Sequence, residues 1–421
     1  MRLPKFMQRA ETKESAAGSL LVVSPGQPAW SNRDYKAFAN EGYGKNVVAY
    51  QCINRVAEAV ASVSWEAWRG DTMVVDSPLL DLLARPNPMQ SGVEWMQAKV
   101  SYLMIAGNSY DEAVKVGSIP AELYTHRPDR IKVVPSSTGI PMAYIYAVGG
   151  RQMRWEVDPN TGDSDISHTK LFNPQDDWYG QSPIEAGSYA IDQHNEAMTW
   201  MQALLQNSAR PSGALVSKAD LPLSDDNFHR LKTQIEDQYS GASNAGRPML
   251  LEGGLDWKQM GLSPTDMGII EAKYSSARDV SLAFGVPPQL IGIPGDNTYA
   301  NYAEARLAFW EDTVIPLVRL LGANLTNWLG PMFGGVELRA NMDAIPAIID
   351  KRAKLWEMAD KSTDLTINER RELKGFEPIP GGDTILVNAS QISLSDAATP
   401  LDIGIDAKAM AKLAGYEQKA D

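Results

Sequence analysis

Residues 182–210, SPIEAGSYAIDQHNEAMTWMQALLQNSAR, carry the strongest helix pattern of this chain. Ser182 and Glu185 match a capping box, in which each side chain satisfies a backbone N–H of the first helical turn. Pro183 stands at the first helical position, which tolerates proline. The next proline is Pro211, so we expect one helix of about 28 residues and, at roughly 1.5 Å per residue, about 42 Å in length.

The apolar residues of this helix form a narrow stripe. They are Ile184, Ile191, Met198, Met201 and Leu205. Four of them stand seven positions apart, which keeps them on one side of the helix, and the other sides are polar. We expect this stem seam to contact either a neighbouring subunit or a second helix of the same chain.

A small unit of mixed helix and strand follows. GALVS (213–217) predicts a strand, Ser224 caps a helix, and RPMLLEG and DWKQMGLS predict two strands joined by the glycine pair 253–254. A second capping box at 263–266 then opens a helix that ends at the Gly-Val-Pro-Pro run 285–288. The βαββ unit is therefore bracketed by two helices.

The C-terminal third begins with a predicted flexible loop, 289–302, which is rich in Gly, Pro and Asn. A long helix is expected from Ala303, kinked or split by Pro316. The run VELRA predicts a strand, and two helices follow, at 344–361 and, behind a capping box, at 366–375.

The N-terminal part has its own core elements. Residues 1–29 lack periodicity and are expected to form a mobile arm. Asn46 caps a predicted core helix that runs to residue 62, and a capping box at 91–94 opens a helix that ends at Gly107. Short β-prone runs then fill 108–168, so the whole chain is predicted to be α+β.

Composition narrows the classes of protein. The 421 residues include 39 Lys and Arg against 52 Asp and Glu, a formal net charge of −13. This balance argues against a protein that grips nucleic acid through an overall basic surface, but not against a local basic stripe. The one cysteine, Cys52, excludes an intramolecular disulfide framework, and we expect it to be buried on its helix.

Neither a membrane span nor a signal peptide is expected. No window approaches about eighteen uncharged apolar residues, and the N-terminus, MRLPKFMQRAETKE, is charged. The pattern predicts a protein that is soluble and intracellular at synthesis.

Motifs of catalysis are few. There is no G-x-x-x-x-G-K-[ST] loop, so we expect no cofactor and no ATP hydrolysis by the chain itself. The histidines are far apart and are expected to be structural. They are His126, His168, His194 and His229. Asp225 and Asp226 fall in the first turn of a helix, where capping explains them, which leaves Asp176 and Asp177 as the candidate ligands of a two-metal site.

A series of phrases, in this order and spacing, resembles tailed-phage portal proteins, the head–tail connectors of double-stranded DNA phages, of the compact siphophage type. The resemblance spans residues 30–390, and a portal from a prophage or gene transfer agent would have the same pattern. The phrases are NVVAYQCINRVAEAVASV, SPLLDLLARPNP, YLMIAGNSY, DISHTKLFNPQDDWYGQSPIEA, AFGVPPQLIG, NYAEARLAFWEDTVIPLVRLL and LTINERRELKGFEPIPGGD.

The resemblance implies an α+β portal fold with named parts. These parts are a flexible N-terminal arm (1–29), the first part of the wing (30–181), stem helix 1 (182–210), a βαββ clip (211–262), stem helix 2 (263–286), a tunnel loop (287–302), the wing spine helix and strand (303–343), a short helical crown (344–392) and a C-terminal tail (393–421). The residues by themselves already placed a small mixed unit between two capped helices, which is the stem–clip–stem order.

The resemblance also implies a homo-oligomeric ring, usually of twelve subunits, at one capsid vertex of the virion, assembled in the host cytoplasm. Double-stranded DNA would pass through its centre without sequence specificity during packaging and ejection. Terminase, then the head–tail adaptor, and the major capsid protein would be its partners, with no membrane. A narrow seam suits helices packed side by side in a ring. The acidic balance also suits a conduit, because contacts that neutralised many phosphates would hold DNA instead of letting it slide.

The tunnel loop would line the narrowest part of this channel. Its Gly and Pro residues permit repositioning, its Asn and Thr residues offer uncharged hydrogen-bonding groups to phosphates, and its tyrosines contact the duplex without a fixed ion pair. The residues are Gly292, Pro294, Gly295, Asp296, Asn297, Thr298, Tyr299, Asn301 and Tyr302. The alternative is an ordinary surface loop, with Tyr302 packed into the core.

Two other functions stay open at this point. One is a metal-dependent nuclease or phosphoryl-transfer enzyme that uses Asp176, Asp177 and a distant histidine. The other is a soluble scaffold or adaptor through which no DNA passes.

Overall fold

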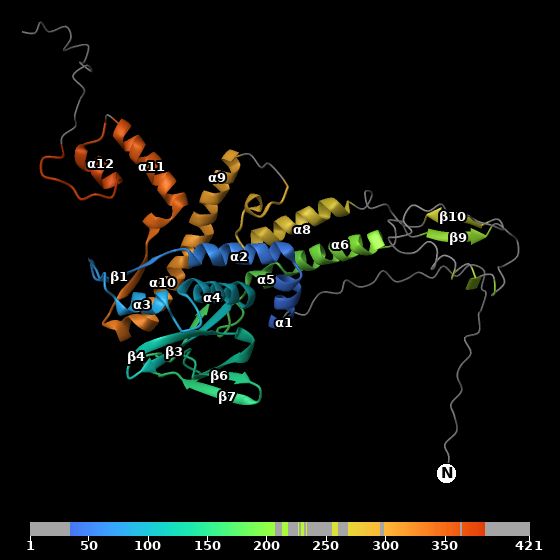
Figure 1. Ribbon diagram of the computed structural model, residues 1–421, viewed down its shortest axis with the longest axis horizontal. Helices are drawn as coiled ribbons and strands as arrows, with labels where there is room; N and C mark the ends of the chain where they lie inside the picture. Colours follow the sequence, from blue (N-terminus) through green and yellow to red (C-terminus); the bar gives the residue numbers. More distant parts are fainter. Residues whose placement is uncertain are drawn as a thin grey trace, which may run out of the picture. The chain divides into compact units, whose positions relative to one another are not determined.

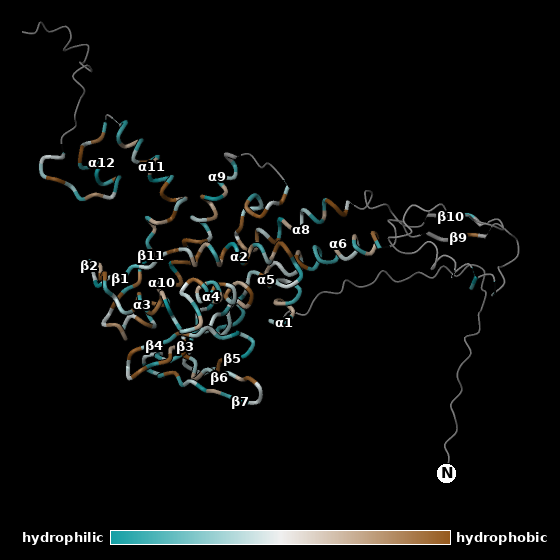
Figure 2. Tube along the Cα trace, in the orientation of Figure 1, coloured by the Kyte–Doolittle hydropathy of each residue, from teal (hydrophilic) through white to brown (hydrophobic). Residues whose placement is uncertain are grey.

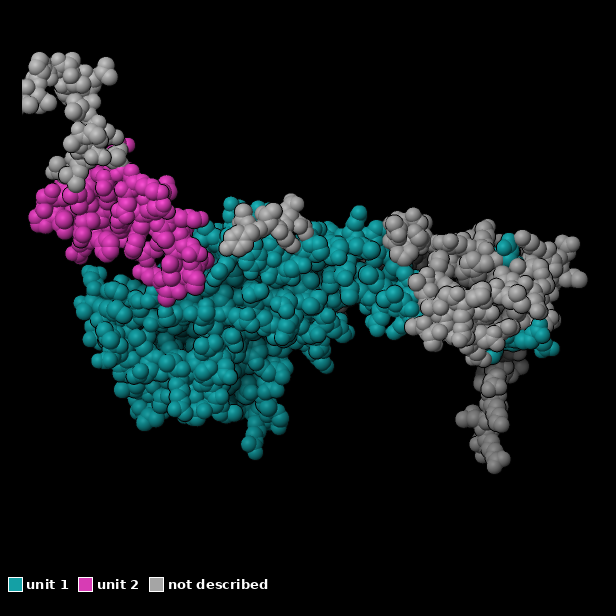
Figure 3. Space-filling view, turned by 45° about the horizontal axis from the view of Figure 1, so that its top comes forward, with its two compact units in different colours: residues 1–342 teal, residues 343–421 magenta. Residues whose placement is uncertain are grey.

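The computed structural model describes residues 34–206, 213–217, 255–259, 268–294, 299–362 and 364–383, and the single positions 226, 229, 230 and 233. The chain divides into two compact units, Met1–Met342 and Asp343–Asp421 (Figure 3). Helices and antiparallel sheets alternate along it, which confirms the α+β class (Figure 1). No helix in these described ranges is long and apolar enough to cross a membrane.

Helix α2 (Val47–Ala61) lies at the centre of the first unit. Asn46 caps it as predicted, because its side-chain oxygen accepts hydrogen bonds from the N–H groups of Val48 and Ala49. Hydrophobic residues recur along this helix (Figure 2). Ile53, Val56 and Val60 are buried, whereas Val47 and Tyr50 are exposed. Cys52 is a fully buried free thiol, as predicted. The short α1 (Tyr35–Ala37) and a π-helical turn, η1 (Phe38–Gly44), precede it.

Helix α4 (Gly92–Ala106) packs against α2. The predicted capping box of Ser91 and Glu94 is present in both directions, and Gly107 ends the helix at a φ of 70°. Helix α3 (Pro78–Ala84) precedes α4 and packs against it.

The predicted β region consists of two three-stranded antiparallel sheets. One has the order β4-β3-β8, with strands Ile119–His126, Asn108–Val116 and Ile166–Lys170. The other has the order β5-β6-β7, with strands Ile131–Val134, Ala143–Val148 and Arg151–Glu156. Residues from both sheets share one buried cluster: Tyr110, Ile131, Val133, Tyr144, Val157 and Ile166.

A buried ion pair joins α4 to the first of these sheets. Lys99 and Asp111 contact each other with both side chains fully buried. Lys99 also donates to the Thr169 hydroxyl at 3.1 Å, and the Thr125 hydroxyl donates to Asp111 at 2.6 Å. Every partner comes from the same chain, so this region satisfies its own buried charges.

A third sheet joins segments of the first unit that lie far apart in the sequence. Strand β1 (Trp65–Arg69) pairs with β2 (Thr72–Met73) on one side and with β11 (Glu337–Ala340) on the other. Strand β11 is the VELRA run that the sequence predicted as a strand.

The long predicted helix 182–210 is interrupted near its start. It begins with α5 (Pro183–Ala186), whose cap Ser182 accepts from the N–H of Glu185, and continues after Gly187 as α6 (Ser188–Gln206). Only the serine half of the predicted capping box is present. At Gly187 the chain lies against α8 (Ile269–Ala283), because a Cβ on this residue would stand 3.1 Å from that of Ala283. The absence of a side chain at Gly187 therefore lets the two helices approach closely at this point.

Two predicted strands between α6 and α8 pair with each other. They are β9 (Gly213–Ser217) and β10 (Leu255–Gln259), which run antiparallel. Positions 226, 229, 230 and 233, in the predicted intervening helix, are helical. The predicted strand RPMLLEG and the capping box at 263–266 lie outside the described residues, as do the arm 1–29 and the tail 393–421.

The predicted helix from Ala303 is divided at the expected place. It consists of α9 (Tyr299–Ala308), a π-helical turn η5 (Phe309–Val314) and α10 (Ile315–Leu329). Pro316 has no N–H to donate to a preceding carbonyl, which explains why the regular α-helical bonding changes just before it. Helix α10 then packs against β11.

In residues 343–362 and 364–383, the described part of the second unit, there are two α-helices, α11 (Pro346–Lys361) and α12 (Ile367–Leu373). Thr366 and Glu369 form the capping box that the sequence predicted. Asn368 holds the turn that follows, because its side chain bonds the backbone N–H and carbonyl of Ile379.

Candidate functional site

The turn after α8 begins the connection predicted to line a channel. Gly285 adopts a φ of +64°, and the Val286 N–H donates to the Ser281 carbonyl at 3.0 Å. The Ser281 hydroxyl donates in turn to the Val286 carbonyl. Two prolines follow, so the helix ends here as the sequence predicted.

This turn is fitted to η5. The Thr313 hydroxyl donates to the Gly285 carbonyl at 2.6 Å, and a Cβ on residue 285 would lie only 2.6 Å from the same hydroxyl oxygen. Glycine is therefore required twice, once for its positive φ and once for the space.

The next residues are held by arginines. A 3-10 turn, η4 (Pro288–Ile291), buries Leu290, and the Arg55 guanidinium donates to its carbonyl at 3.3 Å. Arg278 donates to the Pro294 carbonyl at 2.7 Å. Neither arginine could be predicted from the sequence, because a hydrogen bond to a backbone carbonyl has no sequence signature.

The predicted tunnel loop is shorter than expected at its C-terminal end. Gly292 and Pro294 belong to the anchored segment, whereas residues 295–298 lie outside the described residues. Tyr299, Asn301 and Tyr302 are in α9, because no Gly or Pro between 299 and 303 stops that helix from starting early. The side chain of Tyr302 is 45% exposed, so it is not packed into the core.

Two hollows lie beside α9 and η5. The α2 hollow, about 320 Å³, is lined by side chains of α2 and α9, including Arg55, Glu58, Tyr302 and Arg306. The α8 hollow, about 540 Å³, is lined by side chains of α8 and η5, including Arg278, Asp279, Leu282 and Asp312. Phe309 contributes to both.

The predicted stem seam divides into a buried part and an exposed part. Ile184 and Ile191 are buried inside the subunit, and Ile184 lies against Gly42 of η1. Met198 and Leu205 are 42% and 66% exposed, and Met201 is half-buried. The N-terminal half of the stripe therefore packs within the chain, and only the other half faces outward.

Asp176 and Asp177 act as turn residues. Asp176 accepts hydrogen bonds from the N–H groups of Trp178 and Tyr179, at 2.7 and 3.1 Å, and Lys170 donates to the backbone carbonyl of Asp177. Across the described ranges, no cluster of three His, Cys, Asp or Glu residues is placed to hold a metal ion.

The described histidine environments are structural. His168 stacks on Tyr110 and bonds the Asn108 side chain at 3.0 Å. Burial, with Lys170 and Lys99 nearby, lowers the pKa of His168 to about 3, so it stays neutral. His126 bonds Glu112 at 2.8 Å, and His194 lies 3.2 Å from the Asn46 amide.

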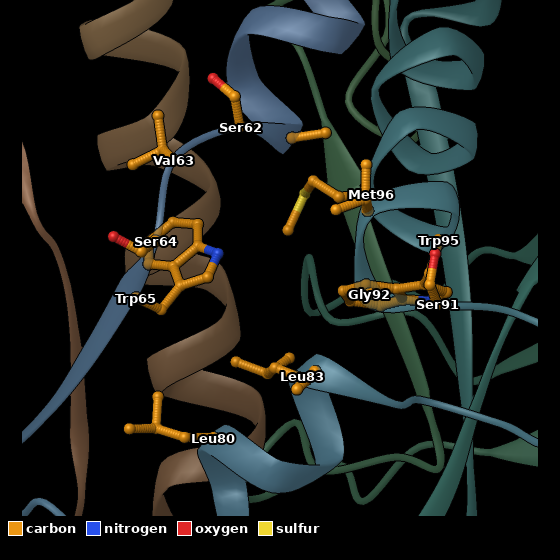
Figure 4. Close-up of a pocket in the computed structure, with 13 residues that line it drawn as sticks. Ser62, Val63, Ser64, Trp65, Leu80, Leu83, Ser91, Gly92, Trp95 and Met96 are labelled. Carbon is orange, nitrogen blue, oxygen red and sulfur yellow. The ribbon is translucent and has the colours of Figure 1, made fainter. Parts of the chain in front are cut away.

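A further pocket, about 500 Å³, lies between the end of α2, β1, α3 and α4 (Figure 4). Its lining includes Trp65, Leu83, Trp95 and Met96, and none of the lining residues is ionisable. It therefore offers space but no acid, base or nucleophile beyond serine hydroxyls.

Known proteins resemble this chain over most of its length. The sequence profile of the phage portal protein family matches residues 47–375. This chain belongs to the phage portal protein family. The portal protein of Enterobacteria phage HK97 is 21% identical to this portal chain over 374 residues, which cover 83% of each. A Rickettsia felis protein is 38% identical over 377 residues, which cover 89% of this chain and 97% of the relative.

Solved structures agree with this assignment. A chain from the neck of an empty gene transfer agent particle is 43% identical, with a TM-score of 0.65, and the match covers 84% of this portal chain and 96% of that chain. The neck of a native particle, computed with C12 symmetry, matches at the same identity with a TM-score of 0.63. The resemblance found in the sequence is thereby confirmed, and the nuclease alternative has no support.

Proposed function

We propose that identical copies of this portal protein form a closed ring at one vertex of a phage or gene transfer agent capsid. The observation that carries the proposal is the 43% identity, over 84% of the chain, to a chain of a particle neck computed with C12 symmetry. Cyclic symmetry of this kind favours twelve subunits. The ring is assembled in the host cytoplasm and remains in the virion.

Double-stranded DNA passes through the ring without sequence specificity. Residues 292–302 approach it at the narrowest point, with Tyr302 exposed on α9 and the preceding residues held by Arg55 and Arg278. These two bonds hold the residues that lead into the loop, at Leu290 and Pro294. The net charge of −13 limits strong phosphate binding, which favours sliding.

The parts of the fold meet different partners. The clip, 211–262, docks terminase during packaging and the head–tail adaptor afterwards, and the outer parts of the ring, with the wing 30–181 and 303–343, face the major capsid protein. The stem consists of 182–210 and 263–286, and the crown of 344–392. The exposed residues Met198 and Leu205, with the half-buried Met201 between them, contribute the stem contact between subunits.

The chain acts without catalysis. Asp176 accepts from two backbone N–H groups of its own turn, which suits a structural role better than a metal site. The purified protein should show no ATPase or nuclease activity. Hydrolysis that copurifies with the wild type and disappears in Asp176→Asn would contradict this.

Negative-stain imaging of the purified full-length protein tests the ring. We expect rings with a central hole wide enough for a DNA duplex. A population of compact monomers at all concentrations would overturn the proposal.

Shortening of residues 295–298 tests the channel role. Rings should form normally, whereas particles should hold less DNA, because the narrowest point is widened. A Gly-Ser replacement of the same length is the matched control and separates loop length from side-chain chemistry. Particles that fill and retain full-length DNA with the shortened loop would make it a mere connector.

A further inference from the structure

The two hollows beside α9 and η5 carry opposite charge. The α2 hollow has two arginines, Arg55 and Arg306, and one glutamate, Glu58. The α8 hollow has two aspartates, Asp279 and Asp312, and one arginine, Arg278, which already donates to a backbone carbonyl. Within the described residues neither Asp279 nor Arg306 has an ion-pair partner, so both charges are free to pair with another molecule.

The hollows face different sides of the same helix. Arg306 lines the first hollow together with side chains of α2, and Asp312 lines the second together with side chains of α8, so the hollows open on different sides of α9 and η5. Ring symmetry requires that one surface of a subunit meets a different surface of the next. A positive hollow and a negative hollow on two sides of one helix satisfy that requirement.

Helix α8 supplies a side chain that can enter a hollow. Leu282 is 78% exposed, and Asp279 lies three residues before it, on the same face of the helix. A single exposed leucine is ordinary at a protein surface. Leu282 is unusual because Asp279, a carboxylate with no ion-pair partner among the described residues, lies beside it on the same face.

The α2 hollow is shaped to receive it. Its floor is apolar, since Leu290, Phe309 and Trp310 are each at least nine-tenths buried, while Arg55 and Arg306 stand exposed at its rim. A volume of about 320 Å³ accommodates a leucine side chain. The chemistry that fits is thus an apolar side chain with an adjacent carboxylate.

We infer that Leu282 of one subunit seats in the α2 hollow of the next copy of this chain, with Asp279 beside Arg306. The inference rests on the proposed ring and names one contact that closes it. Leucine burial supplies affinity, and the ion pair at the rim fixes the orientation of the two subunits. The same contact places neighbouring α9 helices, which carry Tyr302, at a fixed spacing around the channel.

Charge reversal on the full-length protein tests this contact. Asp279→Arg or Arg306→Asp alone should raise the protein concentration needed for ring formation by about tenfold or more, because like charges then meet at each interface. The double variant should restore rings. Asp81→Arg, an exposed aspartate of α3 outside both hollows, is the control of equal charge change and should leave rings unchanged.

The readout is the ring fraction against protein concentration, by mass photometry, with circular dichroism to confirm folding. Leu282→Met should retain rings, and Leu282→Lys should lose them. Single charge variants that form rings at the wild-type concentration, or a double variant that fails to recover, overturn the inference. The inference is also overturned, in favour of a DNA contact, if Arg306→Asp rings assemble normally and particles that contain them hold less DNA.

The outcome for the wild type separates this inference from the proposed function. A wild-type protein that never forms rings contradicts both. Wild-type rings that persist in the single variants contradict the inference alone.

Discussion

The α4–β3–β8 region and the α6–α8 helix pair use apolar and charged residues in opposite ways. In the first region even Lys99 and Asp111 are fully buried and paired by the same chain. In the second, Met198, Leu205 and Ile270 are 42%, 66% and 57% exposed. The first region completes its own core, whereas the second leaves apolar surface for another molecule. We therefore expect folding of the subunit and assembly of the proposed ring to depend on different residues.

The largest loss of subunit stability is expected for Lys99→Met. Removal of the cation leaves Asp111 buried without its charged partner, which should cost about 3–5 kcal/mol of the free energy of unfolding. Urea denaturation at fixed protein concentration measures the change. The exposed pair Arg154–Glu156 is the control, and Arg154→Ala should leave the urea midpoint essentially unchanged. An equal loss at both sites would contradict the contrast between buried and exposed regions.

Gly285→Val is expected to have the next largest effect. A valine there must adopt a positive φ and would meet the Thr313 hydroxyl at 2.6 Å, so we expect a loss of about 1–3 kcal/mol. Thr313→Ser keeps the hydroxyl and should cost much less. Thermal unfolding distinguishes them, and a fully stable Gly285→Val protein would show that the turn is not fitted to η5.

Acid should destabilise the β region through His168. Its pKa is about 3 in the folded chain, below the usual 6.5, so between these values the unfolded state binds a proton that the folded state does not. The contribution of His168 to the free energy of unfolding is therefore fully present above pH 6.5. It is lost as the pH drops toward 3, by up to about 1.4 kcal/mol per pH unit. His168→Gln should flatten this dependence in urea titrations at pH 6.5, 5.5 and 4.5. An unchanged slope in the variant would assign the acid sensitivity to other groups.

The smallest effect on the subunit is expected for Met198→Asp with Leu205→Asp. Both side chains are exposed, so the free energy of unfolding should change by about 0.5 kcal/mol or less while rings are lost. Light scattering and circular dichroism separate the two readouts. Ile191→Asp is the informative contrast, because its side chain is buried and this variant should unfold. Rings that survive the double exposed substitution would remove the stem seam from the interface.

Local signals in the sequence were sufficient for most elements. Helices begin at Asn46, at the Ser91–Glu94 box and at the Thr366–Glu369 box, as the sequence predicted, and one ends at Gly107. These signals are local, because capping bonds join neighbouring residues. The strands of the β region and VELRA were likewise predicted from short runs. The family resemblance rested on longer phrases in a fixed order.

Contacts between distant residues could not be predicted in this way. Gly187 lies against Ala283, Lys99 is paired with Asp111 and Thr169, and Gly285 fits against Thr313. The sequence correctly identified the apolar stripe of the stem seam. Its periodicity alone does not tell which part of the stripe packs against η1 of the same chain. The sequence therefore predicted where the candidate loop lies along the chain. The arginine bonds that hold the residues before it, and the two hollows beside α9 and η5, were visible only in the structure.

The π-helical turn η5 absorbs one additional residue within the long helix. The Ile315 N–H donates to the Trp310 carbonyl, five residues back rather than four. Because the wider turn takes up this residue, α9 and α10 keep nearly the relative rotation of an uninterrupted α-helix that is one residue shorter. Deletion of one residue within 309–314 should therefore restore α-helical geometry while Tyr302 and Arg306 still face the α2 hollow and the buried face of α10 stays in place. A single-codon insertion or deletion at this point thus changes the length of the chain without reorienting the helix on either side.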